Sequence, residues 1–252
     1  MEHLRISTMT AISTMSSNIE LSKLYDKIDI TDIVKFIEHK EKYKGYSKKL
    51  DKKTRKKTAR KTFYNQVTIH IYHNNKIVNV KLFNNGKIQM TGLKYELQGK
   101  EVLEILKKML VNKNENDIFD TDDLEILDYK IVLINSDFDI KYKVNREKLH
   151  REIINLGLYS TYEPCMYPGV NIKYYYNNIN TDNNLGICNC NCKCDGKGEG
   201  NGQGDCKKVT IAVFNSGKII ITGGKNRDQL IKSYEFITKV LKNKEKLSYD
   251  NI

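Results

Sequence analysis

Six cysteines are the residues of this chain whose spacing could do chemistry. Five of them lie in the stretch CNCNCKCDGKGEGNGQGDC, where four alternate with other residues before a glycine-rich run. Thiolates bind zinc well, so this run supplies candidate metal ligands: Cys188, Cys190, Cys192, Cys194 and Cys206. Structural zinc sites prefer C-x-x-C spacing, however, and the alternative is a flexible Gly/Asn loop with reactive thiols. The sequence leaves both interpretations open.

The other residue types form no pattern typical of an enzyme. The five histidines make no H-E-x-x-H motif, and His70 and His73, although spaced H-x-x-H, sit in or beside a predicted strand: His3, His39, His70, His73 and His150. A phosphate-binding loop, a nucleophile elbow and a paired-carboxylate motif are also missing from the sequence. We therefore expect no catalysis and no required cofactor, zinc at the cysteine run aside. An enzyme or thiol-redox protein is the remotest alternative.

The formal charge of +12 is concentrated in one segment. Lys40 to Lys61 holds twelve Lys and Arg against Glu41 and Asp51, so this block is +10 and the rest of the chain is +2. Such a block is typical of a solvated, disordered segment. It is either an arm that binds nucleic acid or a solubilising or nuclear-import loop.

Nothing in the sequence indicates export or a membrane anchor. The first residues, MEHLRISTMTAISTM, lack the basic start and apolar run of a signal peptide. No stretch approaches the roughly 18 apolar residues of a membrane span. We expect an intracellular protein, not secreted, with reduced thiols and no membrane partner.

One string occurs twice in the chain. FNNGKIQMTGLK, Phe83 to Lys94, and FNSGKIIITGGK, Phe214 to Lys225, share eight of twelve positions. In each copy an alternating strand leads into a turn with glycine and a second strand, which predicts an antiparallel hairpin closed by a two-residue turn. A long helical pattern follows each copy, YELQGKEVLEILKKML and RDQLIKSYEFITKVL.

Each half of the chain therefore has the same order of predicted elements. A strand and a helix come first, and the second of these helices begins at Asn145 and ends at Gly157. Further strands, the hairpin and the long helix follow. Residues 1–112 form the first repeat with a basic insertion at 40–61, and residues 113–252 form the second with a Cys/Gly-rich insertion at 177–207. The fold class is α+β, with helices on one face of an antiparallel sheet and the other face open.

These motifs resemble the TATA-box-binding protein family. Its two repeats each end in a hairpin of the form F-x-S-G-K-apolar-apolar-apolar-T-G and a long helix. YEPCMYPGVNIKYY, Tyr162 to Tyr175, is similar to the family's stirrup and the strand after it. The composition, together with FYNQVTI and YEPCMYPGV, resembles the divergent members carried by giant DNA viruses.

The resemblance implies a saddle of two pseudo-symmetric repeats, with a curved antiparallel sheet, an open concave face and helices on the convex face. That face would bind and bend double-stranded promoter DNA through the minor groove; this mechanism is the family's own and is taken over with the resemblance. Phe83, Phe214, Tyr64 and Tyr167 match the aromatic wedges. Alternation adds the other candidate DNA-binding residues on the open face: Lys81, Gln89, Thr91, Thr210, Ala212, Ile220 and Thr222.

The resemblance also implies partners. In the family the second stirrup docks a B-type initiation factor, and here that stirrup reads Glu163, Pro164, Cys165 and Met166. RNA polymerase machinery would be recruited in turn, by a monomer on DNA. The site of action would be the host nucleus or a cytoplasmic viral factory, with packaging in the virion as a further option.

Two features favour a different class of function. The family reads the centre of its site with an asparagine from the first strand of each repeat, and by length these positions fall near Thr8 and Ile131. The first repeat also has the more polar open face. The alternative is a protein-interaction or structural module with this fold and weak or no DNA binding.

Overall fold

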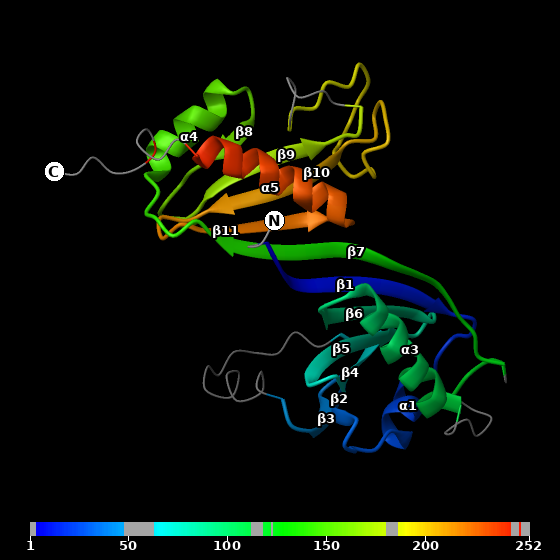
Figure 1. Cartoon of the computed structure of the whole chain (residues 1–252). Coiled ribbons are helices and arrows are strands. Elements are labelled where there is room, and N and C mark those ends of the chain that lie inside the picture. Colours follow the sequence, from blue (N-terminus) through cyan, green and yellow to red (C-terminus); the bar gives the residue numbers. More distant parts are fainter. Residues whose placement is uncertain are drawn as a thin grey trace. The chain divides into compact units, whose positions relative to one another are not determined.

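Antiparallel strands, with helices packed against them, make up most of the protein (Figure 1). The structure is a computed structural model that describes residues 4–47, 63–111, 118–121, 123–179, 186–242 and 247. The chain divides into two compact units, residues 8–132 and residues 1–7 with 133–252. It passes between them within β1 (Arg5–Met15) and within β7 (Ile126–Asp139).

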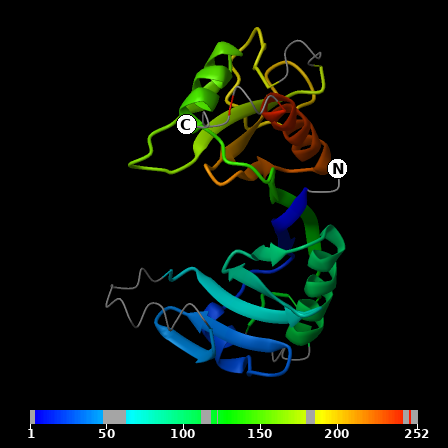
Figure 2. The same ribbon diagram turned by 60° about the vertical axis from the view of Figure 1, so that its left-hand side comes forward.

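The unit of residues 8–132 is a sheet with helices on one face. From the edge, its strands are β3 (Lys42–Gly45), β2 (Val34–His39), β4 (Gln66–His73), β5 (Lys76–Phe83), β6 (Lys87–Leu93) and β1. Helices α1 (Leu21–Lys27) and α3 (Glu96–Val111) pack against it, and Figure 2 shows α3 alongside its strands. The strand register aligns a fully buried row under the helices: Ile37, Ile69, Val80, Met90 and Ala11.

The unit of residues 133–252 repeats this plan. From β7 its strands continue through β11 (Lys218–Gly224), β10 (Lys207–Val213), β9 (Val170–Tyr176) and β8 (Tyr159–Thr161). Helix α5 (Arg227–Leu241) lies across β9, β10 and β11, and α4 (Arg146–Asn155) packs on β8 and β9. The α+β class with antiparallel strands and helices on one face is therefore confirmed in each unit.

The repeated string forms the same hairpin in both units, β5–β6 and β10–β11. The N–H of Gly86 donates to the carbonyl of Phe83 at 3.0 Å, and the N–H of Gly217 donates to that of Phe214 at 3.0 Å. Both glycines have positive φ, +74° and +86°. Three residues lie between Phe83 and Lys87, and three lie between Phe214 and Lys218, where the N–H of Phe214 donates to the carbonyl of Lys218 at 2.9 Å. The expected two-residue turn was therefore wrong. The turn is the three-residue type in which glycine takes the left-handed position.

Each long helix has a buried glutamine in its first turn. The sequence analysis did not predict this structural repeat. Gln98 and Gln229 are 1% and 0% exposed. The Oε1 of Gln98 accepts from the N–H of Lys94 at 2.8 Å, and that of Gln229 accepts from the N–H of Lys225 at 2.7 Å. Each glutamine thus ties the end of the hairpin to the first turn of the helix that covers it.

The basic block is only partly as expected. Lys42–Gly45 is strand β3, paired with β2, and not a disordered segment. Lys44 donates from Nζ to the carbonyls of Tyr25, Asp26 and Ile28 at 2.9 to 3.0 Å, so this lysine holds the strand in place. The rest of the block, residues 48–61, lies outside the described residues. In the described part of the chain, no helix has the length and apolar character to cross a membrane.

We predict that Gln229→Leu destabilises the protein by about 1–3 kcal/mol. The substitution keeps the volume but leaves the N–H of Lys225 and the carbonyl of Glu199 without their present partner, Gln229. Urea unfolding followed by circular dichroism measures the change. Lys232→Leu on the exposed side of α5 is the control and should change stability by less than about 0.5 kcal/mol. Equal stability of the two variants would contradict the role of the glutamine.

Candidate nucleic-acid interface and cysteine cluster

The open face of each unit is the face of its sheet away from the helices. In residues 8–132 the strand register sets its side chains in two rows across the strands. The first row is Thr68, Lys81, Gln89 and Ile12, and the second is His70, Asn79, Thr91 and Thr10. Thr68 and His70 are nearly buried, and the ring of Phe36 lies 4.9 Å from that of His70. The accessible part is thus the part on β5, β6 and β1.

The open face of residues 133–252 has the same two rows with other residues. The first row is Asn171, Ala212, Ile220 and Asp137, and the second is Lys173, Thr210, Thr222 and Asn135. The alternation expected for this hairpin is confirmed: Ile211, Val213, Ile219 and Ile221 are fully buried, whereas Ile220 is 37% exposed. Ala212 is only 5% exposed, because larger neighbours cover so small a side chain.

The two open faces differ at matched positions. Lys81 and Gln89 in the first hairpin correspond to Ala212 and Ile220 in the second, whereas both copies keep a threonine, Thr91 or Thr222. The first hairpin is therefore more polar at these two positions, whereas the two full rows are similarly polar, since the second face also carries Asn171, Asp137, Lys173 and Asn135.

A lysine of the second open face is held by its neighbours. The Nζ of Lys173 donates to Oδ1 of Asn171 and to Oγ1 of Thr210, both at 3.1 Å. Burial lowers the pKa of Lys173, and the charge of Lys208 lowers it further. The side chain therefore presents a fixed hydrogen-bond donor on the open face.

Asn135 is a residue of the open face that the sequence analysis missed. It lies opposite Thr222, whose hydroxyl donates to the Asn135 side-chain oxygen. The positions considered for a central asparagine, Thr8 and Ile131, are a threonine and an isoleucine, and Asn135 lies further along β7. Counting residues could not find it, but the pairing of β7 with β11 does.

An acidic residue also lies on the second open face. Asp137 accepts from Ser7 and from the guanidinium of Arg5, with 2.8 Å between Arg5 Nη2 and Oδ2. Burial would raise the pKa of Asp137, but the hydrogen bonds from Ser7 and Arg5 and the positive charges of Arg5 and Lys218 outweigh it and lower the pKa. The carboxylate is thus ionised and paired at neutral pH.

Two of the predicted wedges meet in the second unit. The rings of Tyr167 and Phe214 are 5.8 Å apart and inclined by 59°, and a Cβ on Gly169 would lie within about 3.4 Å of both. Tyr167 is 41% exposed and Phe214 is half-buried. Glycine at 169 therefore makes room for the aromatic pair.

The first unit arranges its aromatic residues differently. Phe83 is half-buried opposite Gln66, at the end of β5. Phe63 is 60% exposed, with the Nζ of Lys81 5.8 Å from its ring centre. Lys81 belongs to the open face, so Phe63 is a second wedge candidate beside Tyr64.

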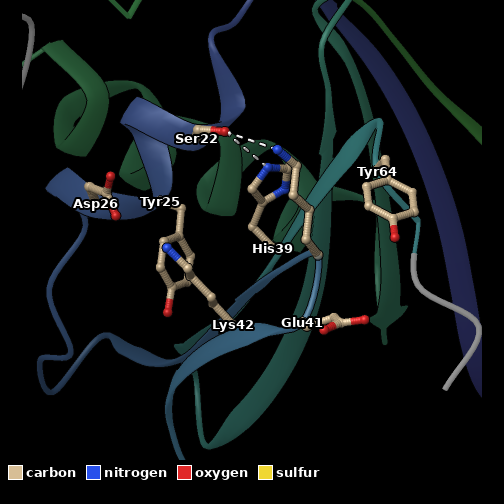
Figure 3. Close-up of a pocket in the computed structure, with 8 residues that line it drawn as sticks. Ser22, Tyr25, Asp26, His39, Glu41, Lys42 and Tyr64 are labelled. Atoms are coloured by element: carbon tan, nitrogen blue, oxygen red, sulfur yellow. Dashed lines mark hydrogen bonds between the residues drawn. The ribbon is translucent and has the colours of Figure 1, made fainter. Parts of the chain in front are cut away.

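Tyr64 lines a pocket of about 420 Å³ together with Ser22, Tyr25, His39 and residues 40–42 of the basic block (Figure 3). The Nε2 of His39 is 3.4 Å from the hydroxyl of Ser22, and its Nδ1 lies 3.0 Å from the backbone carbonyl of Gln66. In a hydrolase the second nitrogen would face a carboxylate, which orients the imidazole. Here a backbone carbonyl takes that place and fixes the orientation of the imidazole.

The stirrup of the second unit is an exposed turn. The N–H groups of Met166 and Tyr167 both donate to the carbonyl of Glu163 at 2.9 Å. Glu163, Pro164, Cys165 and Met166 are all exposed, and Met166 is 83% exposed. The four residues of the expected docking surface are thus accessible together.

Four of the five clustered cysteines converge. The sulfur atoms of Cys188, Cys190, Cys194 and Cys206 lie within 4.8 Å of one another, whereas Cys192 is exposed and outside the group. The N–H of Gly204 donates to the sulfur of Cys190 and lowers its pKa, while burial raises the pKa of Cys206. The sequence grouped all five cysteines, and the folded loop selects four.

Comparisons with known proteins agree with this architecture. Residues 128–244 match the family described as transcription factor TFIID (or TATA-binding protein, TBP). The chain is 36% identical over 203 residues to a TATA-box-binding protein-like protein of Acanthamoeba polyphaga mimivirus, covering 71% of this chain and 48% of the relative. It is 25% identical over 164 residues to the TATA-box-binding protein of Candida albicans, covering 64% of this chain and 50% of the relative. It thus spans about half the length of the curated relatives it matches.

The solved structure of Methanococcus jannaschii TBP has the same fold. It matches with a TM-score of 0.55 and 17% identity over 95% of this chain and 98% of the other. The sequence and structure matches together confirm the resemblance inferred from the repeated hairpin and the stirrup. The chain is therefore a divergent TBP-like protein.

Proposed function

We propose that this protein is a transcription initiation factor that binds double-stranded promoter DNA in the minor groove with the open face of each unit. The observation that carries the proposal is the pair of side-chain rows, repeated in both units. The minor groove presents few hydrogen-bonding groups and therefore distinguishes the base pairs poorly. The threonines of both faces, with Ile12, Ala212 and Ile220, fit such a groove because they leave few polar groups unpaired on binding.

Bending of the DNA follows from the aromatic residues at the ends of the hairpins. Phe214 and Tyr167 would enter a base step together, and Phe83 would do so in the first unit. Wedging side chains unstack the step, at a cost of roughly a few kcal/mol, and the bent duplex then contacts more protein. The proposed bending is the family mechanism, supported here by the adjacent rings at 5.8 Å.

Asn135 supports a preference for A·T pairs under the second unit. Its side-chain oxygen is occupied by the hydroxyl of Thr222, which orients the amide nitrogen as a donor. In the minor groove A·T and T·A pairs present only acceptors, the adenine N3 and thymine O2. The amide and the ammonium of Lys173 would both donate to such acceptors.

The second candidate function is a protein-interaction module that keeps the fold and binds DNA weakly. Asp137 favours this alternative, because a carboxylate on the open face repels phosphates and base acceptors. Arg5 offsets that charge at 2.8 Å, and for this reason we prefer the DNA-binding proposal. A duplex-binding titration with a fluorescence readout of bending distinguishes the two.

We further propose that the exposed stirrup binds a B-type initiation factor, which recruits RNA polymerase. Glu163 and Pro164 match the stirrup motif of the family, whereas Cys165 replaces an acidic residue. The lost charge favours a cognate factor over a host one. The protein would act inside the infected cell, in the nucleus or a cytoplasmic viral factory, in keeping with its similarity to a mimivirus protein.

We predict that Phe214→Ala weakens binding to an A·T-rich duplex about tenfold, or about 1.4 kcal/mol, and reduces the bend. The ring is half-buried and its contact is with Tyr167 at the surface, so the melting temperature should change little. Leu97→Ala is the control, since Leu97 is 59% exposed on α3. A large loss of thermal stability with an unchanged bend would make the ring a core residue and remove the wedge.

We predict that deleting residues 48–61 weakens binding to every duplex and flattens its salt dependence. The segment carries nine Lys and Arg, and the slope of log affinity against log salt falls by about 0.9 for each phosphate that is no longer neutralised. The deletion starts after Lys44, so it keeps the hydrogen bonds by which this lysine holds β3. Gln at the nine basic positions, with the length unchanged, should have the same effect. An unchanged slope in both variants would assign the segment to import or solubility.

We predict that Glu163→Lys abolishes recruitment of the cognate B-type factor to the DNA complex and leaves DNA affinity within about twofold. Glu163 is exposed and lies in the turn of the stirrup, so its charge can act on a partner without altering the fold. A supershift assay with the purified factor gives both readouts. Lys148→Glu on α4 is a control for charge reversal elsewhere on the unit. Normal recruitment by Glu163→Lys would move the docking surface away from the stirrup.

A further inference from the structure

We propose that Cys188, Cys190, Cys194 and Cys206 bind one zinc ion that closes the base of the insertion between β9 and β10. The four sulfur atoms lie within 4.8 Å of one another. This site goes beyond the proposed DNA binding and is independent of it.

The sulfur separations fit a single tetrahedral ion. A Zn–S bond of about 2.3 Å places the corners of a tetrahedron about 3.8 Å apart. The sulfur of Cys206 is 3.4 Å from that of Cys190 and 3.7 Å from that of Cys188. Little movement of the side chains would be needed to coordinate the ion.

The compactness of the cluster also selects the kind of metal centre. A two-iron cluster divides its four thiolates between two metal atoms and spreads them apart. Four sulfur atoms within 4.8 Å leave room for one ion only. Zinc is the ion that four-cysteine structural sites hold, and all four positions are taken by protein ligands, so the site is structural.

Hydrogen bonds support the cluster in the way that metal sites require. The N–H of Gly204 donates to the sulfur of Cys190 at 3.1 Å, and Nδ2 of Asn177 donates to that of Cys206 at 3.3 Å. Such donors stabilise thiolates and fix their orientation. Cys206 is 1% exposed and the other three cysteines are half-buried, and four thiols that converge in this way are better explained by a shared ion than by packing alone.

The ligands come from two segments of the insertion, residues 188–194 and the residue next to β10. Cys206 directly precedes β10, and Cys188 follows Gly186, whose carbonyl accepts from the N–H of Tyr175 in β9 at 2.9 Å. Ordering a long insertion between two strands costs chain entropy, and a metal ion bound at its base offsets part of that cost. The ion would thereby connect the middle of the insertion to its end.

The same closure positions the rest of the insertion on the unit. The carbonyl of Glu199 accepts from Nε2 of Gln229 at 2.8 Å, and Asp205 accepts from the N–H groups of Glu199 and Asn201 at 3.0 and 2.9 Å. The insertion thus reaches the first turn of α5. Metal binding should therefore stabilise the helix end as well as the loop.

The test is the zinc content of the full-length protein purified without chelator. We expect about one zinc per chain, as in structural four-cysteine sites. Cys194→Ser should lose most of this zinc, whereas Cys192→Ser should keep it, because Cys192 is exposed and outside the cluster. Cys194 is only half-buried, so its substitution should leave the protein folded, as circular dichroism can check.

Metal exchange gives a second readout that does not depend on the variants. After removal of zinc by a chelator the melting temperature should fall, and addition of Zn²⁺ should restore it. Replacement by Co²⁺ should give the visible absorption of a tetrahedral cobalt thiolate in the wild type and in Cys192→Ser, but not in Cys194→Ser. Metal-free protein with no cobalt absorption would overturn the proposal. So would an equal loss in the two variants, or iron in place of zinc.

Discussion

The two-residue period of paired strands is the constraint on which the rest of this structure depends. Each unit must bury one face of its sheet, and the rows such as Ile37, Ile69, Val80 and Met90 do so beneath the helices. A slip of one residue in any pair would exchange the two faces and expose that row. The burial that stabilises each unit therefore also decides which side chains the open face presents.

The helix cover is held by the same device in both units. Gln98 and Gln229 accept from the backbone at the end of their hairpins, at 2.8 and 2.7 Å. Because each glutamine is buried, replacing it leaves a polar group unpaired, whereas a change on the open face has no such cost. The two copies of the hairpin string differ on both faces, at Gln89 and Ile220 on the open face and at Met90 and Ile221 in the core. Both copies keep the glycine of the turn and the threonine of the open face.

Local sequence predicts the regular elements well and their long-range placement poorly. Helix α5 spans Arg227–Leu241 as the periodicity indicated, and Asn145 caps α4 by accepting from the N–H of Lys148 at 3.1 Å. The short strands β2, β3 and β8 were missed, since they depend on neighbours distant in the chain. β3 in particular lies within a run of lysines, and its stability comes from pairing with β2 and from the bonds of Lys44.

The site residues follow the same rule. The candidates on the hairpins were found because alternation is a local signal, whereas Asn135 needed the register of β7 against β11. The selection of four cysteines from five depends on a fold of the insertion that C-x-C spacing does not encode. Motif spacing shows what a short segment can do by itself. The cluster depends instead on a loop that brings Cys206 back to Cys188, Cys190 and Cys194.

Electrostatics decides how much of the second open face is compatible with DNA. A carboxylate there would oppose the phosphates unless its charge were cancelled, and Asp137 has its partner in Arg5, from the beginning of β1. The lowered pKa of Asp137 means that the pair persists at neutral pH, since protonation would have to overcome the bonds from Ser7 and Arg5. The side chain of Arg5 is 76% exposed, so its guanidinium is accessible to a phosphate while it neutralises the carboxylate. An acidic residue on this surface thus fixes the position of a cation, which makes Asp137 compatible with a surface that binds DNA.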